Sequence, residues 1–261
     1  MKKFAVFGNP IKHSISPRLH NYAIKELGLD AFYSRILLED NIKLKEKFNT
    51  LNLDGANITI PFKEDAFKVC DHLDRYANHI GSINTLVKKN NTLYGYNTDA
   101  PGFLKAIEEF GKINSALILG AGGTAKALAY ALYTKNIKAD ILNRSEKRKS
   151  NFKQSNFYLW DDFKIEQYDL VINSTSAGLV DEEYPVPKEL LEDIFKNSSF
   201  AFDVIYNKNT PFLRLANSFK IPNKDGKDML VYQAVLALNF FYNSNLDEKK
   251  IEIAMKKAIS L

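Results

Sequence analysis

The chain has 261 residues, of which 45% are hydrophobic and 26% are charged, and its formal net charge is +5. This composition is typical of a soluble globular protein with one large or two modest domains. The single cysteine, Cys70, excludes an internal disulfide framework, and the four histidines have no metal-ligand spacing, so we expect no metal site. The lysines are dispersed and do not form a basic stripe with interleaved aromatic residues, so we expect no nucleic-acid partner.

The N-terminal residues contain two lysines followed by an apolar run that is too short for a signal peptide. The rest of the sequence has no apolar stretch of the length needed to cross a membrane. We therefore expect a cytoplasmic protein without a membrane partner.

Short apolar strands alternate with amphipathic segments in the first part of the chain. Strands are predicted at residues 4–7, 31–38, 56–60, 82–87 and 92–96. Helices are predicted at residues 17–27, at 41–48, after Pro61 and at 98–110. Ser16 is the expected N-cap of the first helix, and Gly28 and Gly111 are the expected ends of the first and last. Asn90-Asn91 should form the turn between the last two strands.

The same alternation continues in the second part of the chain. Strands are predicted at residues 116–119, 139–142, 168–173 and 200–204. Helices are predicted directly after the first of these strands and at residues 188–195, 211–219, 229–242 and 247–259. The acidic, proline-containing segment 181–187 is predicted to be an exposed loop. This order predicts an α/β fold with parallel sheets flanked by helices.

A glycine-rich turn follows the 116–119 strand and leads into a helix, with the sequence Gly120-Ala121-Gly122-Gly123-Thr124-Ala125. Gly120 would allow the tight turn, Gly122 would let the backbone approach a pyrophosphate, and the small Ala125 would permit close packing of helix on strand. The N–H groups at the start of the helix would bind the phosphates. The motif favours a dinucleotide site. Glycine-rich turns are common, so an ordinary turn between a strand and a helix is the alternative interpretation.

The end of the next strand indicates which dinucleotide. Enzymes that bind a free ribose 2′-hydroxyl usually carry Asp or Glu there, whereas this chain has Asn143-Arg144-Ser145 followed by Arg148. Guanidinium groups form bidentate contacts with a phosphate, so the sequence favours NADP(H) over NAD(H). Asp140 is the acidic counter-candidate, but it lies at the start of the strand, and a solvated basic loop is the alternative interpretation.

Polar side chains in the first part of the chain indicate a substrate site. Ser14 and Ser16 lie at the start of a helix, where their hydroxyls could bind a carboxylate or only cap the helix. Lys63 and Asp99 both follow predicted strands, and ligands of open α/β sheets bind beyond the carboxyl ends of strands. A lone lysine is more often a solvated side chain. Asn84 lies near the start of its predicted strand, so this argument supports it less.

Taken together, these segments resemble the shikimate dehydrogenase family over essentially the whole chain. The resemblance rests on motifs in the family's order and spacing: Gly8-Asn9-Pro10 with Ser14 and Ser16, Asn57-x-Thr59-x-Pro61-x-Lys63, Ser82-Ile83-Asn84-Thr85, Asn97-Thr98-Asp99, the glycine turn, Asn143-Arg144-Ser145, Asn173-Ser174-Thr175-Ser176-Ala177-Gly178, Asp203-Val204-Ile205-Tyr206 and Gly226-x-x-Met229-Leu230-x-x-Gln233. Departures from the common pattern are Ser82, Thr124, Lys208 and Asp228.

The resemblance implies an NADPH-dependent, reversible reduction of 3-dehydroshikimate to shikimate, a step in chorismate and aromatic amino acid biosynthesis. Lys63 and Asp99 would be the catalytic pair, and Ser14 and Ser16 would bind the substrate carboxylate. The rest of the substrate would meet Thr59, Asn84, Asp99, Tyr206 and Gln233. Residues implied for the cofactor, besides the glycine turn and the basic loop, are Thr175, Gly226 and Met229.

The resemblance also implies two domains. Residues 1–99 and 228–261 would form the substrate domain, with a mostly parallel sheet and the C-terminal helices returning to it, and residues 100–227 a Rossmann-type NADP domain. Such an enzyme would be a monomer or a homodimer. Two alternatives stay open: a quinate/shikimate type that accepts NAD, and a non-catalytic NADPH sensor, against which the presence of both Lys63 and Asp99 argues.

Overall fold

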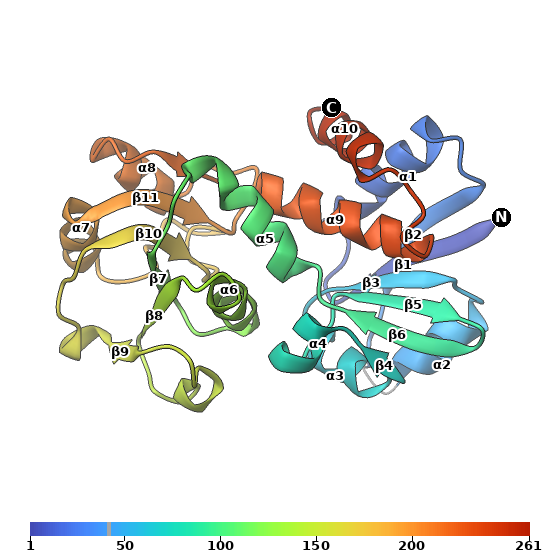
Figure 1. Cartoon of the computed structure of the whole chain (residues 1–261), viewed down its shortest axis with the longest axis horizontal. Helices are drawn as coiled ribbons and strands as arrows, with labels where there is room; N and C mark the ends of the chain where they lie inside the picture. Colours follow the sequence, from blue (N-terminus) through green and yellow to red (C-terminus); the bar gives the residue numbers. More distant parts are fainter. Residues whose placement is uncertain (41–42) are drawn as a thin grey trace. The chain divides into compact units, whose positions relative to one another are not determined.

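The computed structural model describes residues 1–40 and 43–261. The chain divides into two compact units, one made of Met1–Gly102 with Val231–Leu261 and the other of Phe103–Leu230. The chain passes from the first unit to the second within helix α5 (Asp99–Ile107) and returns within α9 (Lys227–Phe241) (Figure 1).

The first unit is built on a mixed six-stranded sheet with the order β2-β1-β3-β5-β6-β4. β1 is parallel to β2 and β3, and β4 to β6, so the predicted mostly parallel sheet is confirmed. β5 runs antiparallel to both β3 and β6, and its pairing with β6 agrees with the predicted Asn90-Asn91 turn. The strands are β1 (Lys2–Gly8), β2 (Ala31–Leu37), β3 (Gly55–Ile58), β4 (His72–Leu73), β5 (Thr85–Lys89) and β6 (Thr92–Tyr96).

The number of helices in the first unit agrees with the prediction more closely than the residues at which these helices begin and end. They are α1 (Ser16–Glu26), α2 (Leu44–Thr50), α3 (Lys63–Lys68), α4 (Arg75–Ile80), the start of α5, most of α9, and α10 (Glu248–Ile259). The prediction that Ser16 caps α1 is wrong: Ile15 is the N-cap and makes no side-chain cap. The first two residues of the predicted 41–48 helix lie outside the described part of the chain.

Two apolar layers cover the two faces of this sheet, because successive residues of a strand point to opposite sides. On one face Phe7 and Ile58 pack with Leu44 and Phe48 of α2. On the other face the ring of Phe4 stacks on Phe241 of α9, with centroids 4.5 Å apart. The predicted return of the C-terminal helices is therefore confirmed.

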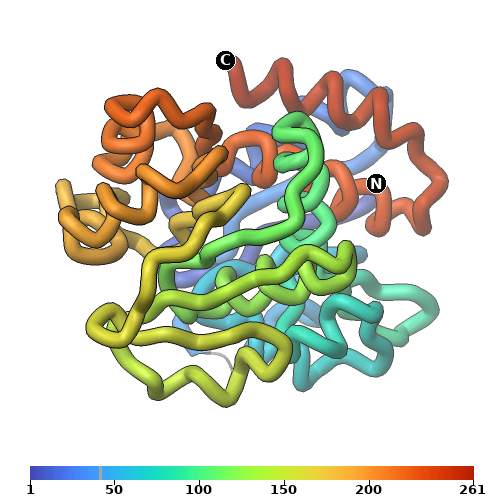
Figure 2. Tube along the Cα trace, turned by 60° about the vertical axis from the view of Figure 1, so that its left-hand side comes forward, coloured from blue at the N-terminus to red at the C-terminus, as the bar shows by residue number. Residues whose placement is uncertain are grey.

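The second unit contains a fully parallel sheet with the order β12-β11-β10-β7-β8-β9. Read from β9 to β12, this is the doubly wound arrangement, in which the strand order reverses between β7 and β10. In such sheets a dinucleotide usually binds in the crevice at the carboxyl ends of these two strands. The strands are β7 (Ser115–Leu119), β8 (Lys138–Asn143), β9 (Phe157–Leu159), β10 (Tyr168–Asn173), β11 (Ser198–Asp203) and β12 (Asn223–Lys224). Figure 2 follows this part of the chain from green to orange.

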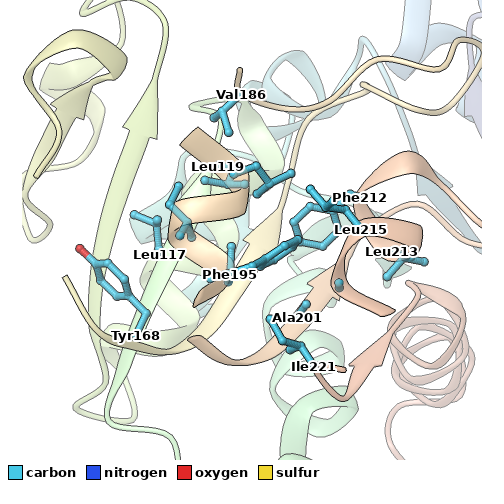
Figure 3. Packing of buried hydrophobic residues seen from close by; sticks show 14 of the residues in the cluster. Leu117, Leu119, Tyr168, Val186, Phe195, Ala201, Phe212, Leu213, Leu215 and Ile221 are labelled. Atoms are coloured by element: carbon cyan, nitrogen blue, oxygen red, sulfur yellow. The ribbon is translucent and has the colours of Figure 1, made fainter. Parts of the chain in front are cut away.

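Helices lie on both faces of this parallel sheet. α7 (Lys188–Lys196) and α8 (Pro211–Ser218) bury Phe195 and Phe212 against Leu117 and Leu119 of β7 (Figure 3). On the opposite face Phe103 of α5 meets Phe202 edge to face at 5.4 Å. The remaining helices are α6 (Gly123–Tyr133), which follows the glycine turn, and 3-10 helices at Glu108–Phe110, Lys149–Asn151 and Trp160–Asp162.

The acidic segment 181–187 is only partly the exposed loop that its composition predicts. Glu182 and Glu183 are exposed, but Val186 is 2% exposed and belongs to the hydrophobic core that α7 and α8 form. An apolar residue between two prolines therefore anchors this loop to the second unit.

A buried histidine gives the first unit a specific pH dependence. The ring of His20 is fully buried and stacks on Tyr33 at 4.2 Å, and neither ring nitrogen has a hydrogen-bond partner. Burial lowers the pKa of His20 from 6.5 to about 3, because the charged form would lose its hydration. The unfolded chain therefore binds a proton below about pH 6.5 that the folded protein does not bind.

We predict that His20 makes the protein less stable as the pH falls from 7 to 5, by about 2 kcal/mol from this group alone. In His20→Phe the free energy of unfolding should change less over this interval than in the wild type, by about that amount. Urea unfolding at the two pH values measures the difference, and the exposed His72→Gln variant is the control. An equal pH dependence in His20→Phe and the wild type would contradict the assignment.

Candidate active site

The polar residues of the first unit gather at one edge of its sheet because of the direction of β5. β3 and β6 end at this edge, and β5 begins there, since it is antiparallel to both. Asn84, directly before β5, therefore lies at the same edge as the residues that follow β3 and β6. The position of Asn84 before its strand offers little support for a functional role, and only the strand pairing shows why it belongs to this edge.

Lys63 and Asp99 form an ion pair at this edge, which agrees with the functional interpretation of both residues. Lys63 is the first residue of α3 and Asp99 the first of α5. The distance between Lys63 Nζ and Asp99 Oδ2 is 2.6 Å, and the two side chains are 27% and 17% exposed. The pair is thus sheltered by the fold but accessible to a ligand.

Asn84 holds the other carboxylate oxygen of Asp99. Its Nδ2 donates to Asp99 Oδ1 at 2.9 Å, while its own Oδ1 accepts from the backbone N–H of Thr98 at 2.8 Å. Gln233 of α9 brings its Oε1 to 3.4 Å from the same Nδ2. α5 and α9 approach closely here, since a Cβ on Gly102 would lie 2.8 Å from the Gln233 nitrogen. Lys63, Asn84, Asp99 and Gln233 therefore form one cluster.

The two serines lie together before and at the start of α1. Ser14 Oγ donates to Ser16 Oγ at 3.2 Å and accepts from the Ser16 N–H at 3.4 Å. Arg35 Nε donates to the Ser14 carbonyl at 2.7 Å. Because Ser16 does not cap the helix, its hydroxyl is held by another side chain and not by backbone N–H groups of α1. This arrangement excludes the interpretation of Ser16 as a helix cap, and the binding of a carboxylate by the two serines stays a prediction.

Two residues to which the sequence assigns no role connect the serines to the cluster. The hydroxyl of Tyr33 interacts with Ser16 and donates to Asn57 Oδ1 at 2.7 Å. Asn57 Nδ2 donates in turn to the Asn84 carbonyl at 3.2 Å and to Thr85 Oγ1 at 3.0 Å. Burial raises the pKa of Tyr33 well above its ordinary value, so the phenol stays protonated as the donor. Tyr33 has the appearance of a core strand residue in the sequence, and only its hydrogen-bond partners reveal the polar connection.

Thr59 lies at the same edge, directly after β3. Its backbone N–H donates to the Phe7 carbonyl at 2.9 Å. A Cβ on Gly8 would lie 2.5 Å from Thr59 Cγ2, so β1 needs glycine where it ends beside this threonine.

In the second unit the glycine turn has the geometry that the motif predicts. Gly120 has φ +98°, and a Cβ there would also meet Thr175 Cγ2 at 2.7 Å, so only glycine fits. Gly122 is the N-cap of α6, and Gly123 has open space around it. Ala125 is fully buried, consistent with close packing of this helix. Ala121 and Thr124 complete the turn between β7 and α6, and Thr175 follows β10 on the other side of the crevice.

The basic loop after β8 reaches the glycine turn. Arg148 Nη1 donates to the Ala121 carbonyl at 3.4 Å, and Asn143 Nδ2 donates to the Ser145 carbonyl at 2.7 Å. Arg144 is exposed.

Asp140, the acidic counter-candidate, is fully buried and accepts from Tyr168 Oη and Asn156 Nδ2, both at 2.9 Å. Asp140 is therefore a structural residue inside the sheet, and no acidic residue takes the place of Asn143.

Three further predicted residues belong to the second unit. Tyr206 lies in the turn after β11, and burial raises its pKa. Gly226 donates its N–H to the Ile205 carbonyl at 3.0 Å, and its α-carbon is packed so closely on Val204 that a side chain would clash. Met229, in the first turns of α9, is 8% exposed.

Over residues 1–40 and 43–261, no group of three or more His, Cys, Asp and Glu side chains is arranged to hold a metal ion. None of the helices described there has the length and apolar character needed to span a membrane.

A doubly wound sheet with a glycine turn at its switch point and a basic loop after the second strand is typical of the NADP(H)-binding domain of an oxidoreductase. Residues 6–86 match the family model of the shikimate dehydrogenase substrate binding domain, and residues 105–208 match that of shikimate/quinate 5-dehydrogenases. The chain belongs to the shikimate dehydrogenase family.

Relatives and solved structures agree with this assignment over the full length. A shikimate dehydrogenase (NADP(+)) of Helicobacter hepaticus is 48% identical over 254 residues, which cover 96% of this chain and 94% of the relative. That of Helicobacter pylori strain J99 is 45% identical, with 96% of each chain covered. The crystal structure of shikimate 5-dehydrogenase from Thermus thermophilus, in complex with NADP(H) and shikimate, is 32% identical, covers 99% of this chain and 100% of that chain, and has a TM-score of 0.86.

We predict that Gly120→Ala destabilises the second unit by about 1–3 kcal/mol, because the new Cβ meets Thr175 in a backbone conformation that L residues rarely adopt. Gly123→Ala is the matched control: nothing lies within 4 Å of its Cβ position. It should leave the free energy of unfolding within about 0.5 kcal/mol of the wild type. Denaturant unfolding measures both variants, and equal stabilities would contradict the predicted clash.

Proposed function

We propose that Lys63 and Asp99 carry out the reaction of this family, the reversible NADPH-dependent reduction of 3-dehydroshikimate to shikimate in the biosynthesis of aromatic amino acids. The observation that carries the proposal is their 2.6 Å ion pair, partly exposed at the carboxyl edge of the sheet and tied to Asn84. NADPH, when bound, supplies the hydride.

The chemistry of a ketone reduction suits this pair. Negative charge develops on the carbonyl oxygen as the ketone is reduced, and the Lys63 ammonium can stabilise that charge and donate a proton to it. Asp99 holds the ammonium through Oδ2 and can accept a hydrogen bond from a substrate hydroxyl. Asn84 keeps the carboxylate from rotating away, because it donates to Oδ1. Catalysis then depends on two acceptor atoms of one carboxylate that have different partners.

The remaining polar residues of the first unit suit the rest of the substrate. Ser14 and Ser16 present paired hydroxyls for its carboxylate, and Arg35, bonded to the Ser14 carbonyl, adds positive charge nearby. Thr59, Asn84 and Gln233 would bind its hydroxyl groups, and the family resemblance implies a substrate contact for Tyr206 as well. This unit would therefore be the substrate domain, with the predicted bounds 1–99 and 228–261, and its separate hydrophobic core supports that division.

Residues of the second unit fit the cofactor by their chemistry. The start of α6 offers N–H groups and a positive helix end to a pyrophosphate, with Gly120 to Ala125 forming the turn. Asn143, Arg144, Ser145 and Arg148 offer donors and positive charge to a 2′-phosphate. Thr175, Gly226 and Met229 would line the nicotinamide site. We also propose a cytoplasmic enzyme, acting as a monomer or homodimer without a nucleic-acid or membrane partner.

We predict that Lys63→Ala lowers kcat for shikimate oxidation by about 100-fold or more, because a positioned acid-base group contributes at least that factor. The dissociation constant for shikimate should rise far less. Steady-state kinetics and direct titration separate the two effects. Lys68→Ala is the matched control, since Lys68 ends the same helix and pairs with Asp65 on the surface. Equal losses of turnover and binding in Lys63→Ala would exclude the catalytic role.

We predict that Arg144→Ala raises KM for NADP⁺ about tenfold or more and leaves the KM for NAD⁺ within about twofold, since a charge-assisted bond to the 2′-phosphate is lost. Arg214→Ala is the control, because Arg214 is a surface arginine of α8 paired with Glu182. Kinetics with both nucleotides test this. If Arg144→Ala weakened both nucleotides equally, the residue would not read the 2′-phosphate.

A further inference from the structure

A fully buried carboxylate, Asp203, lies at the carboxyl edge of the parallel sheet, where β11 ends. It accepts three hydrogen bonds. Thr210 Oγ1 donates to Oδ2 at 2.6 Å, and Asn173 Nδ2 and the Ile205 N–H donate to Oδ1 at 3.1 and 3.0 Å. These partners are neutral, so the charge of Asp203 is balanced by oriented dipoles.

The three donors belong to three different segments of the second unit. Asn173 ends β10, Ile205 lies in the turn after β11, and Thr210 is the N-cap of α8. Asn173 and Thr210 are themselves fully buried. One carboxylate therefore joins the end of a neighbouring strand, the following turn and the start of a helix, and moving it would disturb all three.

Each of the first two segments continues directly into a residue with a proposed role in binding. Asn173 Oδ1 accepts from both the N–H and the hydroxyl of Thr175, at 3.0 and 2.8 Å. Because the Nδ2 of Asn173 donates to Asp203, the amide is held with its Oδ1 facing Thr175. On the other side, Ile205 is held by its N–H to Asp203, and Tyr206 is the next residue. The Ile205 carbonyl accepts from Gly226.

Helix capping alone does not explain this carboxylate. Thr210 Oγ1 caps α8 by accepting from the Leu213 N–H at 3.3 Å, which does not require Asp203. Burial raises the pKa of Asp203 to about 6, and Asp225 adds to this, while the hydrogen bonds oppose it. The carboxylate is therefore held at a cost in stability that an apolar residue would avoid.

We propose that Asp203 is a positioning residue for both ligands: through Asn173 it orients Thr175 toward the cofactor, and through Ile205 it orients Tyr206 toward the substrate. This inference rests on the proposed roles of Thr175 and Tyr206. It predicts that damage at one buried side chain, which touches neither ligand, weakens the binding of both.

The test is Asp203→Ala in the full-length enzyme, with KM for NADP⁺, KM for shikimate, kcat and melting temperature measured together. Alanine has no acceptor for the Asn173 amide or the Ile205 N–H, the two donors through which Asp203 would act. Both KM values should rise about fivefold or more, while kcat stays within about threefold. Asp140→Ala is the matched control, since Asp140 is the fully buried carboxylate of β8 and also accepts from a hydroxyl and an amide. It should lower the melting temperature and leave both KM values unchanged.

Thr210→Val and Thr210→Ser test the same arrangement if Asp203→Ala does not fold. Valine removes the donor that fixes Oδ2, so the carboxylate can turn and its Oδ1 contacts with Asn173 and Ile205 weaken. Both KM values should then rise about twofold to fivefold, and serine, which keeps the hydroxyl, should restore them. Unchanged KM values in Asp203→Ala or Thr210→Val, with only the melting temperature lowered, would overturn the inference.

Thr175→Ala and Tyr206→Phe separate this inference from the proposed function. If Thr175→Ala raises the KM for NADP⁺ and Tyr206→Phe raises the KM for shikimate, but Asp203→Ala raises neither, the positioning role alone fails. If neither variant changes its KM, the proposed binding roles fail and the inference is overturned with them.

Discussion

The candidate active site of the first unit depends on the carboxylate of Asp99. Its two oxygens have different partners, Lys63 on one side and Asn84 on the other, at 2.6 and 2.9 Å. This geometry requires that Asn84, directly before β5, lies beside Lys63 and Asp99, which come after β3 and β6. The antiparallel direction of β5 meets that requirement, because it places the start of β5 beside the ends of β3 and β6.

Both units use polar groups at the carboxyl edge of a sheet, but they hold them in place differently. In the first unit a chain of hydrogen bonds leads from Ser16 through Tyr33 and Asn57 to Asn84. In the second unit a single carboxylate, Asp203, binds three segments at once. In each case buried hydrogen-bond partners fix the positions of polar side chains, so a ligand that binds there would need less ordering of the protein.

Much of the fold could be predicted because its strands and helix ends have local signals. The apolar run of β7, the glycine turn and the Gly28 end of α1 are examples. Short elements such as β4, β9, β12 and α4 were missed, since two to six residues carry too little periodicity. Ser16 was wrongly predicted as a cap because a serine before proline satisfies the pattern, whereas here Ile15 occupies the cap position. Val186 was expected in an exposed loop because composition does not report anchoring contacts.

The chemistry of the site could be predicted where a motif is contiguous and not where it depends on pairing between distant strands. Lys63 and Asp99 follow strands and were expected to function, but their contact joins residues 36 positions apart. The hydrogen bonds of Tyr33, Asn57 and Asp203 join residues far apart in the sequence, so only the structure reveals them. Asp140 was a candidate for ribose binding until its burial beside Tyr168 made it structural.

The most direct test is the oxidation of shikimate by the purified protein, with NADP⁺ and NAD⁺ compared side by side and quinate as the alternative substrate. We predict rapid turnover of shikimate with NADP⁺, and turnover at least about tenfold slower with NAD⁺ or with quinate. Comparable turnover with NAD⁺ or quinate would contradict the assigned specificity. Tight binding of NADPH without any turnover would contradict the catalytic role of the ion pair and indicate a sensor.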